Sequence, residues 1–186
     1  MKKTERKKRR AYLDDFTRDP SGEYRYGGDV FTLDENAGLS RKGFITRIAL
    51  SLAAAVGAAA GQGLIPAPGM DNSPIVLIPY ALSLVALLVL LWAEAGILTA
   101  EYPMRKYKFD RHVRTLPVRA IVFASFEAAI IVGMTVHIAI YGVGGKILPA
   151  VFFYFFCVLG AVAALLAGHT AKTSSWVPVG KKSLVD

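Results

Sequence analysis

The chain has 186 residues and a formal net charge of +8, and 54% of its residues are hydrophobic, with a mean hydropathy of +0.42. This composition is too apolar for a soluble domain with a solvated surface. The single cysteine, Cys157, excludes an intrachain disulfide and therefore a small secreted fold held by cysteine bridges.

The first 43 residues form a polar segment without an apolar run of helical length. Within it, the stretch GEYRYGGDVFTL places two short β-prone runs on either side of Gly27 and Gly28. This pattern predicts a short β-hairpin over residues 22–33. Because an isolated hairpin is only marginally stable, we expect it to lie on another surface or to remain flexible.

The same segment begins with the basic run KKTERKKRR. No nucleic-acid recognition fold accompanies this run, so we expect no nucleic-acid partner. A basic residue near an anionic membrane surface contributes about 1 kcal/mol of attraction. We therefore expect the run to fix the topology and to contact lipid headgroups through Lys2, Lys3, Arg6, Lys7, Lys8, Arg9 and Arg10.

Four long apolar stretches follow, at residues 44–65, 75–99, 118–141 and 147–168. Each is close to the ~20 residues that a helix needs to cross a bilayer, where backbone groups must pair internally. The alternative, a soluble all-helical core, leaves too little polar surface. The sequence predicts an all-α integral membrane protein, an up-down bundle of four transmembrane helices. A polar segment (residues 1–43) precedes the bundle (44–168) and a polar tail (169–186) follows it.

Lys and Arg are distributed unevenly between the two sides of this bundle. The first 43 residues hold eleven of them, the loop of residues 100–117 five and the tail three. The loop of residues 66–74 has none, and residues 142–146 have only Lys146. The positive-inside rule therefore predicts both termini in the cytoplasm. We interpret the first stretch as an uncleaved span, because a secretory signal has a much shorter polar leader.

Three further stretches carry a resemblance: RRAYLDDF, the Tyr-rich GEYRYGG, and IPAPGM in the first outer loop. Together with the four spans, they give a chain that resembles uncharacterised small bacterial membrane proteins. The resemblance implies a multi-pass protein of the bacterial inner membrane. It carries over no activity.

Two carboxylates interrupt the apolar stretches. Glu94 lies seven residues before Glu101, roughly 10 Å into the second span, and Glu127 lies ten residues past Pro117, roughly 15 Å into the third. Ionised groups inside a membrane are costly and usually face protein or water. One interpretation is a pair that handles protons or cations. The other is structural, with Glu94 paired to Arg47 of the first span and Glu127 hydrogen-bonded within the bundle.

The histidines of this chain are candidate haem or metal ligands. His137 lies near the outer end of the third span and His169 near the inner end of the fourth, so the two cannot share one haem. His112 lies alone in a basic loop, and no HExxH or Cys/His cluster is present. We expect no metal and no cofactor, and we keep His137 as a candidate intramembrane polar residue.

Small residues recur at four-residue spacing on two spans. Such stripes let helix backbones approach closely, either within one chain or between chains. Intrachain packing and contact with an oligomer or partner remain equally good interpretations. The candidate helix-packing residues are Ala53, Gly57 and Gly61 on the first span and Gly160, Ala164 and Gly168 on the fourth.

Two classes of function follow from these features. The first is an accessory or scaffold subunit of a membrane complex, suggested by small size, small-residue stripes and a cytoplasmic leader able to dock. The second is a small proton-coupled transporter or ion-conducting homo-oligomer that uses the intramembrane carboxylates. We do not expect an enzyme, because no nucleophile or metal motif is recognisable.

Overall fold

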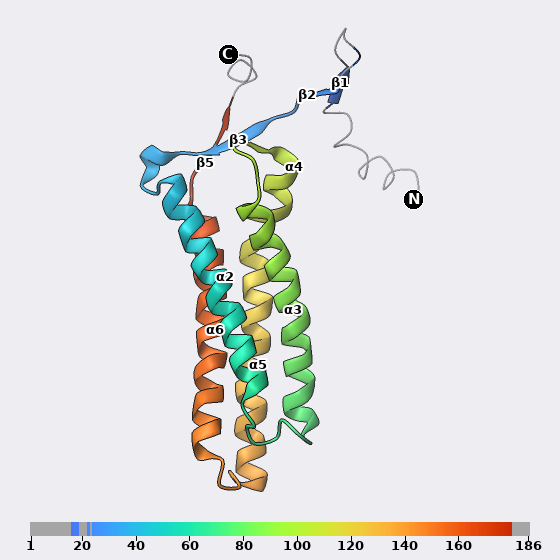
Figure 1. The fold of residues 1–186 in the computed structure, drawn as a ribbon, viewed down its shortest axis with the longest axis vertical. Coiled ribbons are helices and arrows are strands. Elements are labelled where there is room, and N and C mark those ends of the chain that lie inside the picture. The colour runs from blue at the N-terminus through green and yellow to red at the C-terminus, as the bar shows by residue number, and fades with distance from the viewer. Residues whose placement is uncertain (1–15, 19–21, 23, 180–186) are drawn as a thin grey trace.

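The computed structural model describes residues 16–18, 22 and 24–179 and is dominated by four long helices (Figure 1). All four are long and apolar enough to cross a membrane. The prediction of a mostly helical protein with four candidate spans is therefore confirmed. The helices are α2 (Arg41–Leu64), α3 (Pro74–Leu98), α5 (Leu116–Tyr141) and α6 (Ile147–Thr173).

Successive long helices run in opposite directions along the bundle (Figure 1). The central helix α5 packs against both α3 and α6, whereas α2 packs mainly against α6. Short connections join α2 to α3 and α5 to α6 at one end of the bundle. The longer connection between α3 and α5 lies at the other end.

The ends of the helices depart from the apolar stretches for local reasons. Helix α2 begins before the first apolar residue, because the Ser40 hydroxyl caps it by accepting a hydrogen bond from the Gly43 amide (3.2 Å). Helix α6 continues to Thr173, so His169 belongs to the helix and not to the polar tail.

A small sheet covers the end of the bundle at which α2 begins and α6 ends. Its central strand β3 (Val30–Leu33) pairs antiparallel with β4 (Met104–Arg105) on one side and with β5 (Trp176–Val179) on the other. We call these three strands the cap and this end of the bundle the capped end (Figure 1). The short elements beside the strands are η1 (Glu35–Ala37), α4 (Lys106–Lys108) and the π-helical turn η2 (Phe109–Val113).

The predicted hairpin over residues 22–33 is wrong. Strand β2 (Tyr24–Tyr26) pairs with β1 (Phe16–Arg18), and β3 pairs with β4 and β5. The reason is that both hydrogen-bonding edges of β3 are occupied by partners distant in sequence. Val30 and Leu33 are also buried, which favours the long-range sheet over a local turn at Gly27 and Gly28.

Aromatic side chains hold the cap against the helices. Trp176 of β5 makes an edge contact with Phe44 of α2 (centroids 5.5 Å apart), stacks on Tyr102 (6.0 Å) and lies 5.2 Å from the Phe109 ring. The Arg41 guanidinium lies over the Tyr102 ring, with its central carbon 4.1 Å from the ring centroid. Such contacts contribute about 0.5–1.5 kcal/mol each beyond buried area.

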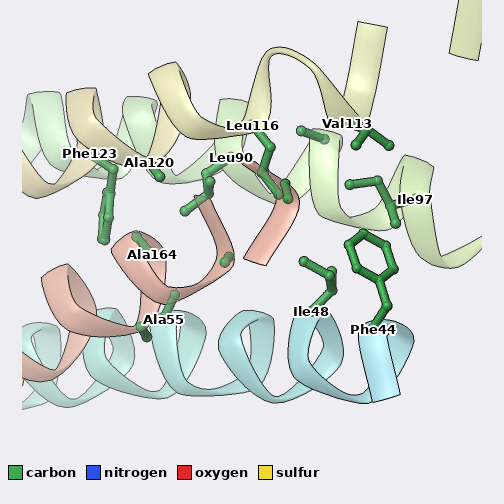
Figure 2. Packing of buried hydrophobic residues seen from close by; sticks show 14 of the residues in the cluster. Phe44, Ile48, Ala55, Leu90, Ile97, Val113, Leu116, Ala120, Phe123 and Ala164 are labelled. Atoms are coloured by element: carbon green, nitrogen blue, oxygen red, sulfur yellow. The ribbon is translucent and has the colours of Figure 1, made fainter. Parts of the chain in front are cut away.

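The interior of the bundle is apolar and closely packed. Near the capped end, Phe44 and Ile48 of α2 point toward Ile97 of α3 (Figure 2). A second cluster fills the opposite half of the bundle and consists of Ala67, Val76, Ile130, Met134, Phe153 and Cys157.

The outer surface of the bundle is also apolar. Leu50, Leu88, Val118 and Phe155, one from each long helix, are all more than half exposed. A soluble monomer rarely exposes continuous apolar surface on every side. The arrangement suits a helix bundle surrounded by lipid.

Candidate functional site

The two intramembrane carboxylates are the most unusual side chains of the bundle. Glu94 on α3 and Glu127 on α5 both have 0% of their surface exposed. A buried carboxyl group requires hydrogen-bond partners, since otherwise its burial costs free energy. The partners therefore define what each site can do.

Glu94 is held by a serine that bridges two helices. The Ser51 hydroxyl oxygen on α2 lies 2.7 Å from the Ala163 carbonyl oxygen of α6 and 3.2 Å from Glu94 Oε1. A hydroxyl has one hydrogen, so Ser51 donates to one of these oxygens at a time. While it donates to Ala163, the contact with Glu94 is a hydrogen bond only if Glu94 carries a proton and donates it to Ser51.

Glu127 is held by an amide from the same helix α2. Gln62 Nε2 donates to Glu127 Oε2 over 2.7 Å. The Ser83 hydroxyl and the Cys157 thiol lie near the same carboxyl group, although Ser83 donates to the Tyr80 carbonyl (2.9 Å). Because a Gln amide can be turned over without changing its shape, the 2.7 Å contact also suits a protonated carboxyl donating to the amide oxygen.

Each carboxyl group retains one oxygen without a hydrogen-bond partner, Oε2 in Glu94 and Oε1 in Glu127. The Gln62 oxygen is likewise unpaired. Both sites therefore have unused hydrogen-bonding capacity inside the protein. Such capacity suits proton binding chemically.

The two carboxylates do not form a pair. Their partners Ser51 and Gln62 are eleven residues apart on α2, which corresponds to ~16 Å along the helix. Glu94 and Glu127 therefore lie at different levels of the bundle. Glu94 lies four residues from the end of α3 at Leu98, whereas Glu127 lies eleven residues from the start of α5 at Leu116.

Arg47 does not neutralise Glu94. Across the described part of the chain, no ion pair joins these two residues. Arg47 is exposed and lines an outward groove between α2 and α6, together with His169. The structural interpretation of a Glu94–Arg47 pair is therefore wrong, and a neutral hydroxyl takes the place of the expected cation.

His137 lies at the end of the bundle opposite the cap. Its ring packs beside Tyr141 (centroids 4.9 Å apart) and closely against the loop glycine Gly69, and its Nδ1 atom has no hydrogen-bond partner. With Asn72 and Ser73 it lines a pocket of about 360 Å³. His137 is remote from Glu94 and packs against the loop between α2 and α3.

No metal centre is formed by the described residues: none of their His, Cys, Asp and Glu side chains gather in groups of three or more. His112 instead packs against the α3 backbone at Gly96 and makes an edge contact with Trp92 (centroids 5.7 Å apart). The basic run Lys2–Arg10 lies outside the described residues.

The small-residue stripe of α2 has two environments. Gly61 packs so closely against the Phe156 ring of α6 that a Cβ atom would lie 2.7 Å from it. At Gly57 a Cβ atom would meet nothing within 4 Å, and Ala53 is exposed. Only part of this stripe therefore serves packing inside the bundle.

The stripe of α6 lies inside the bundle. A Cβ atom at Gly160 would lie 3.3 Å from Ala58 Cβ of α2, and one at Gly168 would lie 2.9 Å from Ala120 Cβ of α5. Ala164 is fully buried. These three positions bring α6 close to both α2 and α5. This favours the interpretation of the α6 stripe as packing within one chain.

Sequence reasoning missed the residues that hold the carboxylates. Ser51 and Gln62 are the polar side chains of α2 that point inward, and both are buried. The sequence does contain an indication of both residues, since a polar residue in an apolar span usually faces protein. Gly133 was also missed, although a Cβ atom there would collide with the Ile75 carbonyl oxygen of α3.

The chain matches no protein-family model, no curated protein and no solved structure.

Proposed function

We propose that this protein is an accessory or scaffold subunit of a bacterial inner-membrane complex, with its capped end in the cytoplasm. The observation that carries the proposal is the cap. Three segments from distant parts of the chain meet there in one sheet, fixed to the helices by aromatic contacts. Such a surface suits docking of a partner, and no step of catalysis explains it.

The charge distribution supports the cytoplasmic placement. The connections at the uncapped end carry one basic residue, Lys146, which lies 3.4 Å from Asp71. The described basic residues of the capped end are Arg41, Lys42, Arg105, Lys106, Lys108, Arg111, Arg114 and Lys172. An excess of Lys and Arg favours the cytoplasmic side of a membrane.

Strand β5 supports a specific mode of docking. It is an outer strand of the three-stranded sheet, and its Val177 side chain is exposed. An extended segment of a partner can add to such an edge by main-chain hydrogen bonds, with Pro178 accepting only, since it has no N–H. The open positions Ala53 and Gly57 on α2 provide a second contact region, at the level of the membrane.

The test is affinity purification from native membranes in mild detergent, followed by native mass determination. We expect a second protein in stoichiometric amount. Val177→Glu, which places a charge on the outer strand, should lower its recovery at least tenfold. Asn72→Glu, an exposed position at the uncapped end, is the matched control and should leave recovery unchanged. A lone monomer under these conditions contradicts the proposal.

A small proton-coupled transporter or ion-conducting homo-oligomer is the second candidate, favoured by the unpaired carboxyl oxygens of Glu94 and Glu127. Proton flux into vesicles containing the purified protein tests it. Glu94→Gln and Glu127→Gln should each lower the flux at least tenfold, whereas Glu101→Gln, an exposed carboxylate outside the helices, should not. Unchanged flux in both buried variants excludes this function.

A further inference from the structure

The groove between α2 and α6 combines a basic end with apolar walls. It has a volume of about 450 Å³. Arg47 and His169 lie at its end nearest the cap, and Ser51 and Thr170 contribute the other polar groups. The remaining lining residues are apolar: Leu50, Ala54, Leu159, Val162, Ala163 and Leu166.

The basic residues lie close to the capped ends of their helices. Arg47 is six residues from the start of α2 at Arg41, or ~9 Å, and His169 is four residues from the end of α6 at Thr173, or ~6 Å. Lys172 lies one helical turn beyond His169. Because α2 and α6 are antiparallel, Arg47 and His169 share one end of the groove.

Arg47 lacks an acidic partner in the described part of the chain. The groove lining includes no Asp or Glu either, since Glu94 is buried behind Ser51. A cation within a membrane-spanning helix is costly unless it is paired or reaches the interface. A phosphate group at this level supplies the missing anion and matches the planar guanidinium fork.

The apolar walls continue along the bundle axis away from the charges. From His169 to Leu159 the groove follows α6 for ten residues, or ~15 Å, and from Arg47 to Ala54 it follows α2 for seven, or ~10 Å. Leu50 and Leu166 are largely exposed. The groove is thus open to the surrounding lipid along its length.

We propose that this groove binds one anionic phospholipid, with its phosphate on Arg47 and His169 and an acyl chain along Leu50, Val162 and Leu166. The layout of charge at one end and apolar surface beyond it matches a phospholipid lying parallel to the helices. A transmembrane helix of a partner has no comparable reason to meet Arg47 unless it carries an acidic residue. Basic pockets between helices at the membrane surface bind anionic headgroups in this way.

The experiment is native mass spectrometry of the full chain, stripped of lipid in nonionic detergent and titrated with phosphatidylglycerol or phosphatidylcholine. We expect one phosphatidylglycerol per chain, bound at least tenfold more tightly than phosphatidylcholine. The Arg47→Gln/His169→Gln double variant should lose this preference. Lys42→Gln, an exposed basic residue of the same helix end outside the groove, should retain it. Equal losses in both variants would indicate diffuse attraction and overturn the proposal.

A second pair of variants tests the acyl-chain seat without changing charge. Ala54→Trp fills the groove and should lower retention of both lipids at least fivefold, whereas the neighbouring exposed Ala53→Trp should not. Soluble glycerol phosphate should fail to displace the lipid at millimolar concentration, because it lacks the acyl chain. Displacement by it overturns the lipid assignment in favour of a free-phosphate site.

Photocrosslinking keeps the proposal testable even if a variant fails to fold. Wild-type protein in vesicles containing phosphatidylglycerol with a photoreactive acyl chain should be labelled on peptides that contain Leu50 or Leu166. Labelling spread evenly over Leu88 and Val118, on the opposite helices, overturns the proposal. Finding a helix of another protein in the groove, in place of lipid, also overturns the proposal.

Discussion

The contact between Gln62 and Glu127 offers a sharp test of the bundle interior. Gln62 and Glu127 are 1% and 0% exposed, and 2.7 Å separates Gln62 Nε2 from Glu127 Oε2. Gln62→Leu keeps nearly the same volume but removes the donor. The cost is then that of a buried polar group left unpaired, about 1–3 kcal/mol.

Measurements inside membranes give smaller values, averaging about 0.6 kcal/mol per interhelical hydrogen bond. We therefore expect Gln62→Leu to lower the free energy of unfolding by about 1–2 kcal/mol, since the stranded partner is a carboxyl group and not a neutral amide. The assay is reversible denaturant unfolding in detergent micelles, monitored by circular dichroism.

A double-mutant cycle isolates the contact. If the hydrogen bond is formed, Gln62→Leu/Glu127→Leu should be less destabilised than the sum of the single variants by about 1 kcal/mol. Thr135→Val removes a hydroxyl that donates to Ile131 O within α5 (2.8 Å) and lies 2.9 Å from the Tyr154 hydroxyl of α6. It should be additive with Glu127→Leu. Additive behaviour of Gln62 and Glu127 within ~0.3 kcal/mol would refute the assigned contact.

Three further predictions concern packing and the cap. Gly133→Leu should lower the free energy of unfolding by about 2–3 kcal/mol, measured by thermal unfolding, because the new side chain meets the rigid Ile75 carbonyl. Gly57→Leu, which faces open space, should change this free energy by less than ~0.5 kcal/mol. Trp176→Ala should raise hydrogen exchange of the β3 amides at least tenfold while leaving α5 unchanged, because the cap loses its aromatic anchor. Burial raises the pKa of Tyr102 above its ordinary value of 10.0, with Arg41 partly opposing the shift. The neutral phenol therefore stabilises the cap below about pH 10, and this contribution should be lost at higher pH. The loss should appear as a change in Trp fluorescence, and Tyr102→Phe should abolish that change.

Each of these predictions has a contrary outcome. Equal effects at the two glycines would mean that α3 and α5 do not approach at Gly133. Unchanged exchange in β3 would place the cap's stability elsewhere than in Trp176. An alkaline transition that persists in Tyr102→Phe would assign it to another phenol or to a lysine.

The helices were predictable because their signal is local. Four apolar runs of bilayer length leave few alternatives, and the helix bounds differ from them only where caps act, as at Ser40. The cap was not predictable in the same way. Strand β3 finds its partners at Met104–Arg105 and Trp176–Val179, and nothing local in GEYRYGGDVFTL indicates such distant pairing.

The burial of the two carboxylates follows from the sequence, but their separation does not. Glu94 and Glu127 stand out in any apolar run, and both are buried. Their separation could not be obtained from loop positions, since the segment between α3 and α5 contains β4, α4 and η2, so the level at which α5 begins is not set by a simple loop. Ser51 and Gln62 set the two levels, and only the packing of α2 against its neighbours reveals this.

The pairing of β3 with β5 has a consequence for how the protein is made. One strand precedes α2 and the other follows α6, so the sheet is completed only after the whole of α6 has been synthesised. Until then, the edge of β3 that pairs with β5 lacks its partner, and an unpaired strand edge can pair with another chain. Cap closure therefore requires residues from both sides of the helix bundle.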